Sequence, residues 1–216
     1  MLEDLKSQVI LTAQKAQRDG LMKHKSGNVS ASDEETGYFV ITPSGIDREL
    51  LQIRDMCVLT KDLELLEGAK PSSEALMHAA CYRERPDIRA IVHTHSKMAT
   101  AFAVLNKPVA ATVYEMFVFP LQNAEIPVAP YGRPGTQELA DNVAGVIKHN
   151  NMALMERHGA IAVGDSPEEA LLAAGYIEEF AEIYYYTLQM NGGKEPPVFT
   201  KEELDAWTYP EQLGRG

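Results

Sequence analysis

The spacing of apolar and polar residues predicts helices interleaved with short strands. Residues 2–19 repeat apolar side chains at helical spacing, and Gly20 follows the last of them. A long helix is predicted over 166–190, where Ser166 fits the N-cap and Pro167 fits the first helical position. The other predicted helices span 72–84, 96–105, 135–150 and 200–207.

Short apolar runs bounded by turn residues predict the strands. Residues 88–95, IRAIVHTH, form a mostly apolar run that ends in polar residues. Residues 152–155 and 160–164 form two strands that flank a tight turn. Further strands or extended segments are predicted at 38–42, 56–60, 109–114 and 126–131. Irregular alternation of this kind predicts a layered α/β domain, and the pattern alone leaves the strand directions open.

Composition and charge narrow the functional classes. The chain has 216 residues, 45% of them apolar, so we expect one domain over residues 1–216. No apolar run has the length of a bilayer span, and the first residues mix acids and lysines with apolar positions. We therefore expect a cytoplasmic protein without a membrane partner, in which Cys57 and Cys81 stay reduced. The net charge of −11 disfavours nucleic acid as a partner but leaves a small anionic substrate possible.

Two histidines stand one residue apart at the end of the predicted strand 88–95. Side chains at i and i+2 of a strand share a face, so His93 and His95 project together. His158 stands in the tight turn between two apolar strands, which would hold it rigidly. A single histidine of this kind is most often structural, but three neutral imidazoles leave the open position that a catalytic metal requires. Zinc is the first expectation, with manganese, cobalt or iron open.

Three short stretches rich in Gly, Ser and Asn predict an anion site. They are KSGNVS (25–30), TPSGID (42–47) and KPSSEA (70–75). A helix that starts near Ser72 and Ser73 offers free N–H groups and the positive end of its dipole to an anion. Each stretch alone is most simply a turn or a cap. The serine pair, however, precedes Glu74, a carboxylate at the same helix start.

These pieces, in this order, resemble the class II (metal-dependent) aldolase and adducin N-terminal-like family, of the L-fuculose-phosphate aldolase type. The matching motifs are SGNVS, ITPSGI, PSSEALMH, AIVHTHS and RHGAIAVG, which run from Gly27 to Gly164. The resemblance implies a three-layer α/β/α sandwich with a largely antiparallel central sheet. It also implies a homotetramer with active sites at the subunit interfaces.

The resemblance also implies roles for particular residues. The metal ligands would be His93, His95 and His158, and Glu74 would be the acid/base group that can contact the metal when substrate is absent. The phosphate of the substrate would bind at the three corners, which here are Gly27, Asn28, Ser44, Gly45, Ser72 and Ser73.

Two tyrosines are further catalytic candidates by the same resemblance. Tyr114 stands where the family has a tyrosine that can face a neighbouring subunit's site. Tyr209 is the candidate from the C-terminal tail, and it is equally consistent with a surface residue. Phe117 and Phe119 stand where the type enzyme has small residues, which leaves the identity of the sugar open.

The activity implied is the reversible cleavage of a ketose 1-phosphate to dihydroxyacetone phosphate and an aldehyde, through a metal-stabilised enediolate. L-Fuculose 1-phosphate and 5-deoxy pentulose or hexulose 1-phosphates are the candidate substrates. Proton transfer by Glu74 calls for a pKa raised by burial, which a nearby cation would oppose.

Other activities of the superfamily remain open. They are pentulose-5-phosphate 4-epimerase, which usually has Asp in place of Glu74, methylthioribulose-1-phosphate dehydratase, and phosphorylated oxo-acid decarboxylase. A non-catalytic binding protein is a remote alternative, because such a protein would be expected to have lost Glu74 or one of the histidines.

Overall fold

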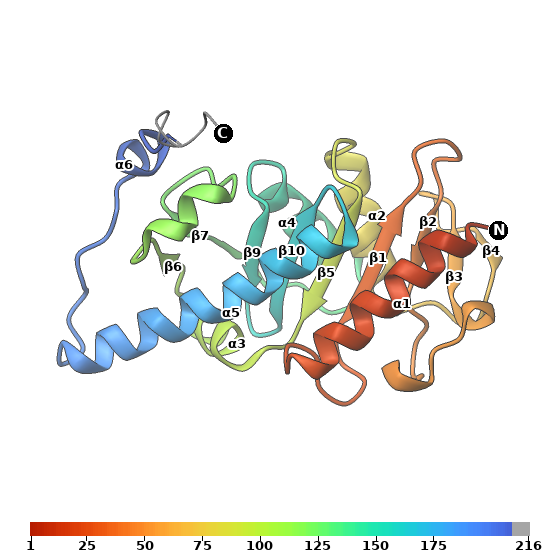
Figure 1. Cartoon of the computed structure of the whole chain (residues 1–216), viewed down its shortest axis with the longest axis horizontal. Coiled ribbons are helices and arrows are strands. Elements are labelled where there is room, and N and C mark those ends of the chain that lie inside the picture. Colours follow the sequence, from red (N-terminus) through yellow and green to blue (C-terminus); the bar gives the residue numbers. More distant parts are fainter. Residues whose placement is uncertain (209–216) are drawn as a thin grey trace, which may run out of the picture.

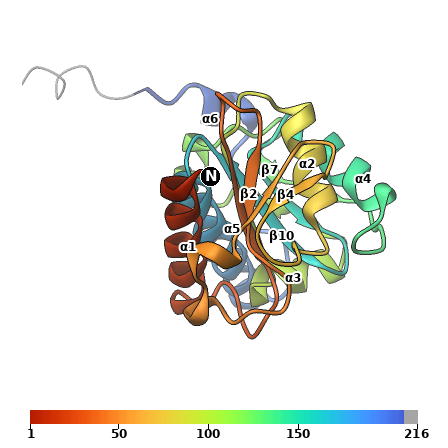
Figure 2. The ribbon, with the colours of Figure 1, turned by 90° about the vertical axis from the view of Figure 1, so that its right-hand side faces the viewer.

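The computed structural model describes residues 1–208, which form three layers with a β-sheet in the middle (Figure 1). Figure 2 shows α1 on one side of the sheet and α2 and α4 on the other. The long α5 and the short α3 pack on the same side as α1. The helices are α1 (Glu3–Arg18), α2 (Ala75–Glu84), α3 (Lys97–Val104), α4 (Gln137–Ile147), α5 (Pro167–Met190) and α6 (Lys201–Asp205), with 3-10 turns η1 (Arg48–Leu50), η2 (Ile53–Asp55) and η3 (Tyr114–Val118).

The central sheet has eight strands in the order β4-β3-β2-β1-β5-β10-β9-β8. Every neighbouring pair is antiparallel except β8 and β9, which are parallel. The three-layer fold with a largely antiparallel sheet is therefore confirmed. The strands are β1 (Asn28–Ser32), β2 (Phe39–Ile41), β3 (Cys57–Leu59), β4 (Leu65–Glu67), β5 (Ala90–Thr94), β8 (Val128–Ala129), β9 (Met152–Met155) and β10 (Gly159–Gly164), with β6 (Val109–Ala110) and β7 (Glu125–Ile126) paired separately.

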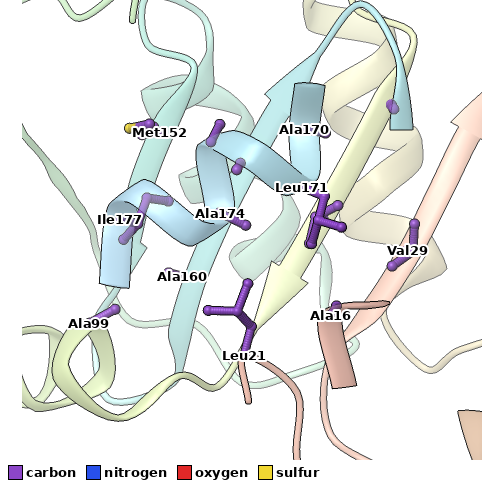
Figure 3. Packing of buried hydrophobic residues seen from close by; sticks show 14 of the residues in the cluster. Ala16, Leu21, Val29, Ala99, Met152, Ala160, Ala170, Leu171, Ala174 and Ile177 are labelled. Carbon is purple, nitrogen blue, oxygen red and sulfur yellow. The ribbon is translucent and has the colours of Figure 1, made fainter. Parts of the chain in front are cut away.

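Alternation along the central strands divides the core between the two faces of the sheet. In β5, Ala90 and Val92 pack on the α1 and α5 side, while Ile91 packs on the α2 and α4 side. His93 shares the face of Ile91, because side chains two apart in a strand point the same way. Figure 3 shows the small side chain of Ala174 and the branched side chains of Leu171 and Ile177 on α5, which pack over the first of these faces.

Local signals explain where the longest helix begins. The Ser166 hydroxyl accepts a hydrogen bond from the Glu169 backbone N–H, and Pro167 occupies the first helical turn, as the sequence predicts. α5 then runs to Met190, which is the predicted end. In residues 1–208, no helix combines the length and apolarity of a membrane span.

Two sequence expectations need correction in the fold. The sequence predicts a turn or corner at 25–30, but Asn28 begins the central strand β1, which runs to Ser32. The strand expected at 109–114 is limited to Val109–Ala110, and Tyr114 begins the 3-10 turn η3. The sequence pattern does not indicate β1, because its α2-facing positions are all polar, and two of them, Asn28 and Ser30, are buried against polar partners.

Candidate active site

Three neighbouring strands bring the predicted site residues to one place. Asn28 on β1 and Ile161 on β10 both pair with His93 on β5. The turn before β10 carries His158, and Arg157 in this turn adopts a positive φ of 56°. The tight turn predicted from the sequence is therefore present, and it places His158 beside the end of β5.

The three histidines and Glu74 meet in one cluster. His93 Nε2 lies 3.0 Å from His95 Nε2 and 3.1 Å from Glu74 Oε2. Glu74 Oε1 lies 3.2 Å from His158 Nε2. One ligand atom from each of the four residues lies within 4.8 Å of the others. Residues that the sequence separates by up to 84 positions are thus brought within coordination distance of a single ion.

The donor atoms of this cluster fit a divalent cation. His93 Nδ1 donates to the Ala160 carbonyl at 2.8 Å, so in the neutral ring that binds a metal the free acceptor is Nε2, which faces the cluster. Glu74 Oε1 is buried without a hydrogen-bond partner among the described residues. Both atoms are electron-rich, and a cation placed between them would satisfy them. Three imidazoles and one carboxylate suit zinc, and also manganese or cobalt.

Two glycines allow the strands to approach this closely. A Cβ on Gly159 would lie 2.2 Å from the Thr94 carbonyl oxygen and 3.3 Å from a ring carbon of both His93 and His95. A Cβ on Gly27, whose φ is +75°, would lie 2.7 Å from the His93 carbonyl oxygen. Any larger residue at either position would push a neighbouring strand away from the cluster.

Burial and proximity shift the pKa values of the cluster in different directions. Burial raises the pKa of Glu74, but the neighbouring imidazoles and an amide lower it by more, so the net direction is downward. Burial and the other imidazoles lower the pKa of His95 and of His158 to about 4. Burial lowers the pKa of His93, but Glu74 raises it by more. The expected effect of burial on the pKa of Glu74 is therefore present, but the opposing charges outweigh it, and the residue is a carboxylate at neutral pH.

A cavity of about 190 Å3 adjoins the cluster. Glu74 and His95 contribute to its lining, as does Ser73, which directly precedes Glu74, the N-cap of α2. The backbone N–H groups of Ser44 and Ser72 are already bonded to Lys70 and Thr42 carbonyls, which ties the corners together. The lining includes all six residues that the resemblance assigns to phosphate, namely Gly27, Asn28, Ser44, Gly45, Ser72 and Ser73.

Arg48 is a cavity residue that the sequence reasoning missed. Its side chain is buried, with 2% of the residue exposed, and it lines the same cavity. Within residues 1–208, its hydrogen-bond acceptors are the backbone carbonyls of Lys25, Gly27 and Ile46 instead of a carboxylate. The guanidinium group of Arg48 thus links two of the three predicted corners and places a positive charge beside the cavity of an acidic protein. The sequence feature that could have indicated Arg48 as a cavity residue is its position directly after the TPSGID stretch.

The aromatic candidates lie away from the cavity in the described part of the chain. Tyr114 is 55% exposed and stacks on Phe117, with 5.9 Å between ring centroids. Phe117 also stacks on Trp207 at 3.8 Å, and Phe119 packs against Tyr176 of α5. None of these residues lines the cavity beside Glu74. Tyr209 lies outside the described residues, so the catalytic roles of both tyrosines stay predictions.

Comparison with known proteins identifies the family. Residues 7–185 match the class II aldolase and adducin N-terminal domain. An L-fuculose phosphate aldolase of Escherichia coli O6:H1 is 36% identical over 201 residues, which cover 93% of this chain and 90% of the relative. A 5-methylthioribulose-1-phosphate/5-deoxyribulose-1-phosphate aldolase of Escherichia coli O45:K1 is 39% identical over 83% of both chains.

A solved structure agrees with the sequence relatives. An L-fuculose 1-phosphate aldolase superposes with a TM-score of 0.86 at 34% identity, over 94% of this chain and 93% of that protein. The match includes the layers and the mostly antiparallel sheet that carry the histidine cluster. The chain therefore belongs to the class II aldolase and adducin N-terminal domain family.

Proposed function

We propose that this chain is a metal-dependent aldolase that cleaves a ketose 1-phosphate reversibly to dihydroxyacetone phosphate and an aldehyde. The observation that carries the proposal is the meeting of His93, His95, His158 and Glu74 beside a cavity lined by hydroxyl, amide and guanidinium groups. The names of the sequence relatives support the same reaction class. Zinc is the proposed metal, with manganese and cobalt as alternatives.

The histidine cluster and the adjoining cavity have different roles in the proposed reaction. His93, His95, His158 and Glu74 would hold a divalent cation, which would act as a Lewis acid toward the substrate ketone. The cavity residues hold the phosphate, because the Ser44 and Ser73 hydroxyls offer donors and Arg48 supplies charge. Binding at the unreactive phosphate orients the reacting carbons next to Glu74.

Glu74 carries the proton at carbon. Its lowered pKa leaves it ionised, so in the direction of bond formation it accepts a proton from the carbon of dihydroxyacetone phosphate that forms the new bond. In cleavage the same carboxyl group returns a proton to that carbon. We propose that Tyr114 or Tyr209, from a neighbouring subunit, serves the hydroxyl group of the aldehyde half.

Assembly and location extend the proposal. We infer a homotetramer with active sites at subunit interfaces, which is consistent with the exposed ring of Tyr114. A single domain over residues 1–216 is supported by one sheet that joins strands from both halves of the sequence. A cytoplasmic location agrees with Cys57 and Cys81, which are both free and buried.

A coupled assay tests the proposal. The metal-loaded protein is incubated with L-fuculose 1-phosphate and with 5-deoxyribulose 1-phosphate, and dihydroxyacetone phosphate is detected through NADH oxidation. We expect turnover of at least one substrate and its loss in Glu74→Gln. Mass spectrometry of the products separates cleavage from epimerisation, dehydration and decarboxylation. Conversion without dihydroxyacetone phosphate would replace the proposed reaction by one of these alternatives.

A further inference from the structure

A ladder of buried polar side chains connects α2 and β1 behind the cluster. Glu74, His78 and Tyr82 follow one another at intervals of four residues, so they lie on one face at the start of and along α2. Asn28 and Ser30 are two apart on β1 and share a face. The exposed fraction of each of the five residues is 6% or less.

Four contacts join these residues in a single line. Asn28 Nδ2 lies 2.9 Å from Glu74 Oε2, and Asn28 Oδ1 lies 2.5 Å from His78 Nε2. Ser30 Oγ lies 2.6 Å from His78 Nδ1 and 2.7 Å from the Tyr82 hydroxyl. Both ring nitrogens of His78 therefore have protein partners, and the line ends on a carboxylate oxygen of the cluster.

The chemistry of the five groups fixes the direction of every hydrogen bond. An ionised carboxylate only accepts, so the amide nitrogen of Asn28 donates to Glu74. The amide oxygen then faces His78, whose Nε2 must carry a hydrogen. The His78 ring is fully buried, and both of its ring nitrogens face uncharged partners, an amide oxygen and a hydroxyl. A neutral ring fits this setting, so its Nδ1 accepts from Ser30. The Ser30 oxygen in turn accepts from the Tyr82 hydroxyl.

We propose that His78, held as the neutral tautomer with hydrogen on Nε2, is a positioning residue that orients Asn28 and thereby Glu74. This inference rests on the proposed function and deepens it. With the tautomer reversed, His78 would present a lone pair to the Asn28 oxygen, and the amide would turn its oxygen toward the carboxylate. Glu74 Oε2 would then lose its amide donor. Because the Asn28 nitrogen has a second hydrogen and lines the anion cavity, the same orientation also provides a donor to the substrate.

If the contact between α2 and β1 were purely structural, apolar side chains at these positions would stabilise it at least as well as the polar ones. Buried polar side chains stabilise a fold only when every group is paired, and here the pairing depends on one tautomer of one ring. The ladder leads from the interior to the proton-carrying group of the site. Its geometry therefore favours control of Glu74 over simple packing.

Neutron diffraction from perdeuterated, full-length crystals tests the inference directly. We expect a deuteron on His78 Nε2, none on Nδ1, and the Asn28 amide nitrogen directed at Glu74. A deuteron on Nδ1, or on both nitrogens, would overturn the inference. The outcome does not depend on any variant, and a wild-type enzyme that is active with the wrong tautomer would overturn this inference alone.

A matched pair of variants tests the consequence for catalysis. The amide nitrogen of Gln in H78Q can replace the Nε2 donor to Asn28, whereas the shorter Asn in H78N reaches only the Ser30 side. We expect kcat of H78N to fall about tenfold or more below that of H78Q, with a smaller change in KM, because small misplacements of a reacting group cost large factors in rate. Melting temperature and metal content are measured as controls.

The results separate the two proposals. Equal kcat values in H78Q and H78N, at equal melting temperature and metal content, would overturn the positioning role while leaving the aldolase proposal intact. Absence of sugar-phosphate cleavage by the wild type would overturn the aldolase proposal, whatever the hydrogen positions. If both variants unfold, Ser30→Ala is the milder test, and an unchanged kcat in that variant would also count against the positioning role.

Discussion

Replacement of Gly159 by Ala tests whether the close approach of β10 and β5 builds the site. The added Cβ would lie 2.2 Å from the Thr94 carbonyl oxygen, where ordinary contacts begin at 3.4 Å. That atom belongs to the backbone of a central strand and cannot rotate away. Overpacking of this kind costs about 1–3 kcal/mol, and the rigid neighbour predicts the upper half of that range. For a chain of this size, the melting temperature should fall by roughly 4–12 °C.

The control for this prediction is the same substitution at Gly145. A Cβ there meets no atom within 4 Å, and the position lies inside α4, so Gly145→Ala should leave stability unchanged or raise it by up to about 1 kcal/mol. Unfolding is followed by circular dichroism in metal-free buffer, and zinc affinity is measured separately. The Gly159 variant should also bind zinc more weakly, because its Cβ crowds His93 and His95. Equal melting temperatures and zinc affinities for the two variants would refute the reasoning.

Three further predictions concern other parts of the molecule. Arg48→Met should weaken the binding of inorganic phosphate about tenfold or more in calorimetric titration, since a hydrogen bond to a charged group contributes roughly 1.5–3 kcal/mol; an unchanged affinity would remove Arg48 from the anion site. The hydrogen bond from Lys6 lowers the pKa of Glu67 below its ordinary 4.5, so this contribution to stability is present above that pH and lost as the pH falls through the folded-state pKa. Glu67→Gln should accordingly flatten the acid limb of the unfolding free energy against pH, and an unaltered limb would contradict this. Burial raises the pKa of Cys57 to about 11 and of Cys81 to about 12, so neither thiol should react with a disulfide reagent at mildly alkaline pH until the protein unfolds.

Sequence periodicity explains part of the candidate site. The strand period alone places His93 and His95 on one side, and their ring centroids lie 4.8 Å apart. The convergence of His158 with this pair depends on β10 lying next to β5. Strand order in a sheet is a tertiary property, so only the family resemblance could predict that contact before the structure was known.

The sequence pattern did not reveal β1 or the polar face of α2, because the buried residues that join them are polar. The sequence of β1 resembles a loop because its α2-facing positions are polar, among them Asn28 and Ser30, whose partners are also polar. The spacing of Glu74, His78 and Tyr82 was visible as a four-residue repeat. A polar stripe on a helix normally predicts a solvent-exposed face. Only the position of β1 opposite this stripe shows that it is buried. The direction of the pKa shift of Glu74 likewise depended on neighbours that no spacing specifies.

Metal content per chain tests the central claim most directly. Wild-type protein and His158→Ala are each loaded with zinc, dialysed against the same buffer and analysed by inductively coupled plasma mass spectrometry. Because His158 Nε2 lies 3.2 Å from Glu74 and is separated from the other histidines in the sequence, its loss removes a ligand without touching β5. We expect one zinc ion per wild-type chain and a marked loss in the variant, with both proteins folded. Equal zinc in both proteins, or none in the wild type after loading with zinc, manganese or cobalt, would contradict a metal site built from this cluster.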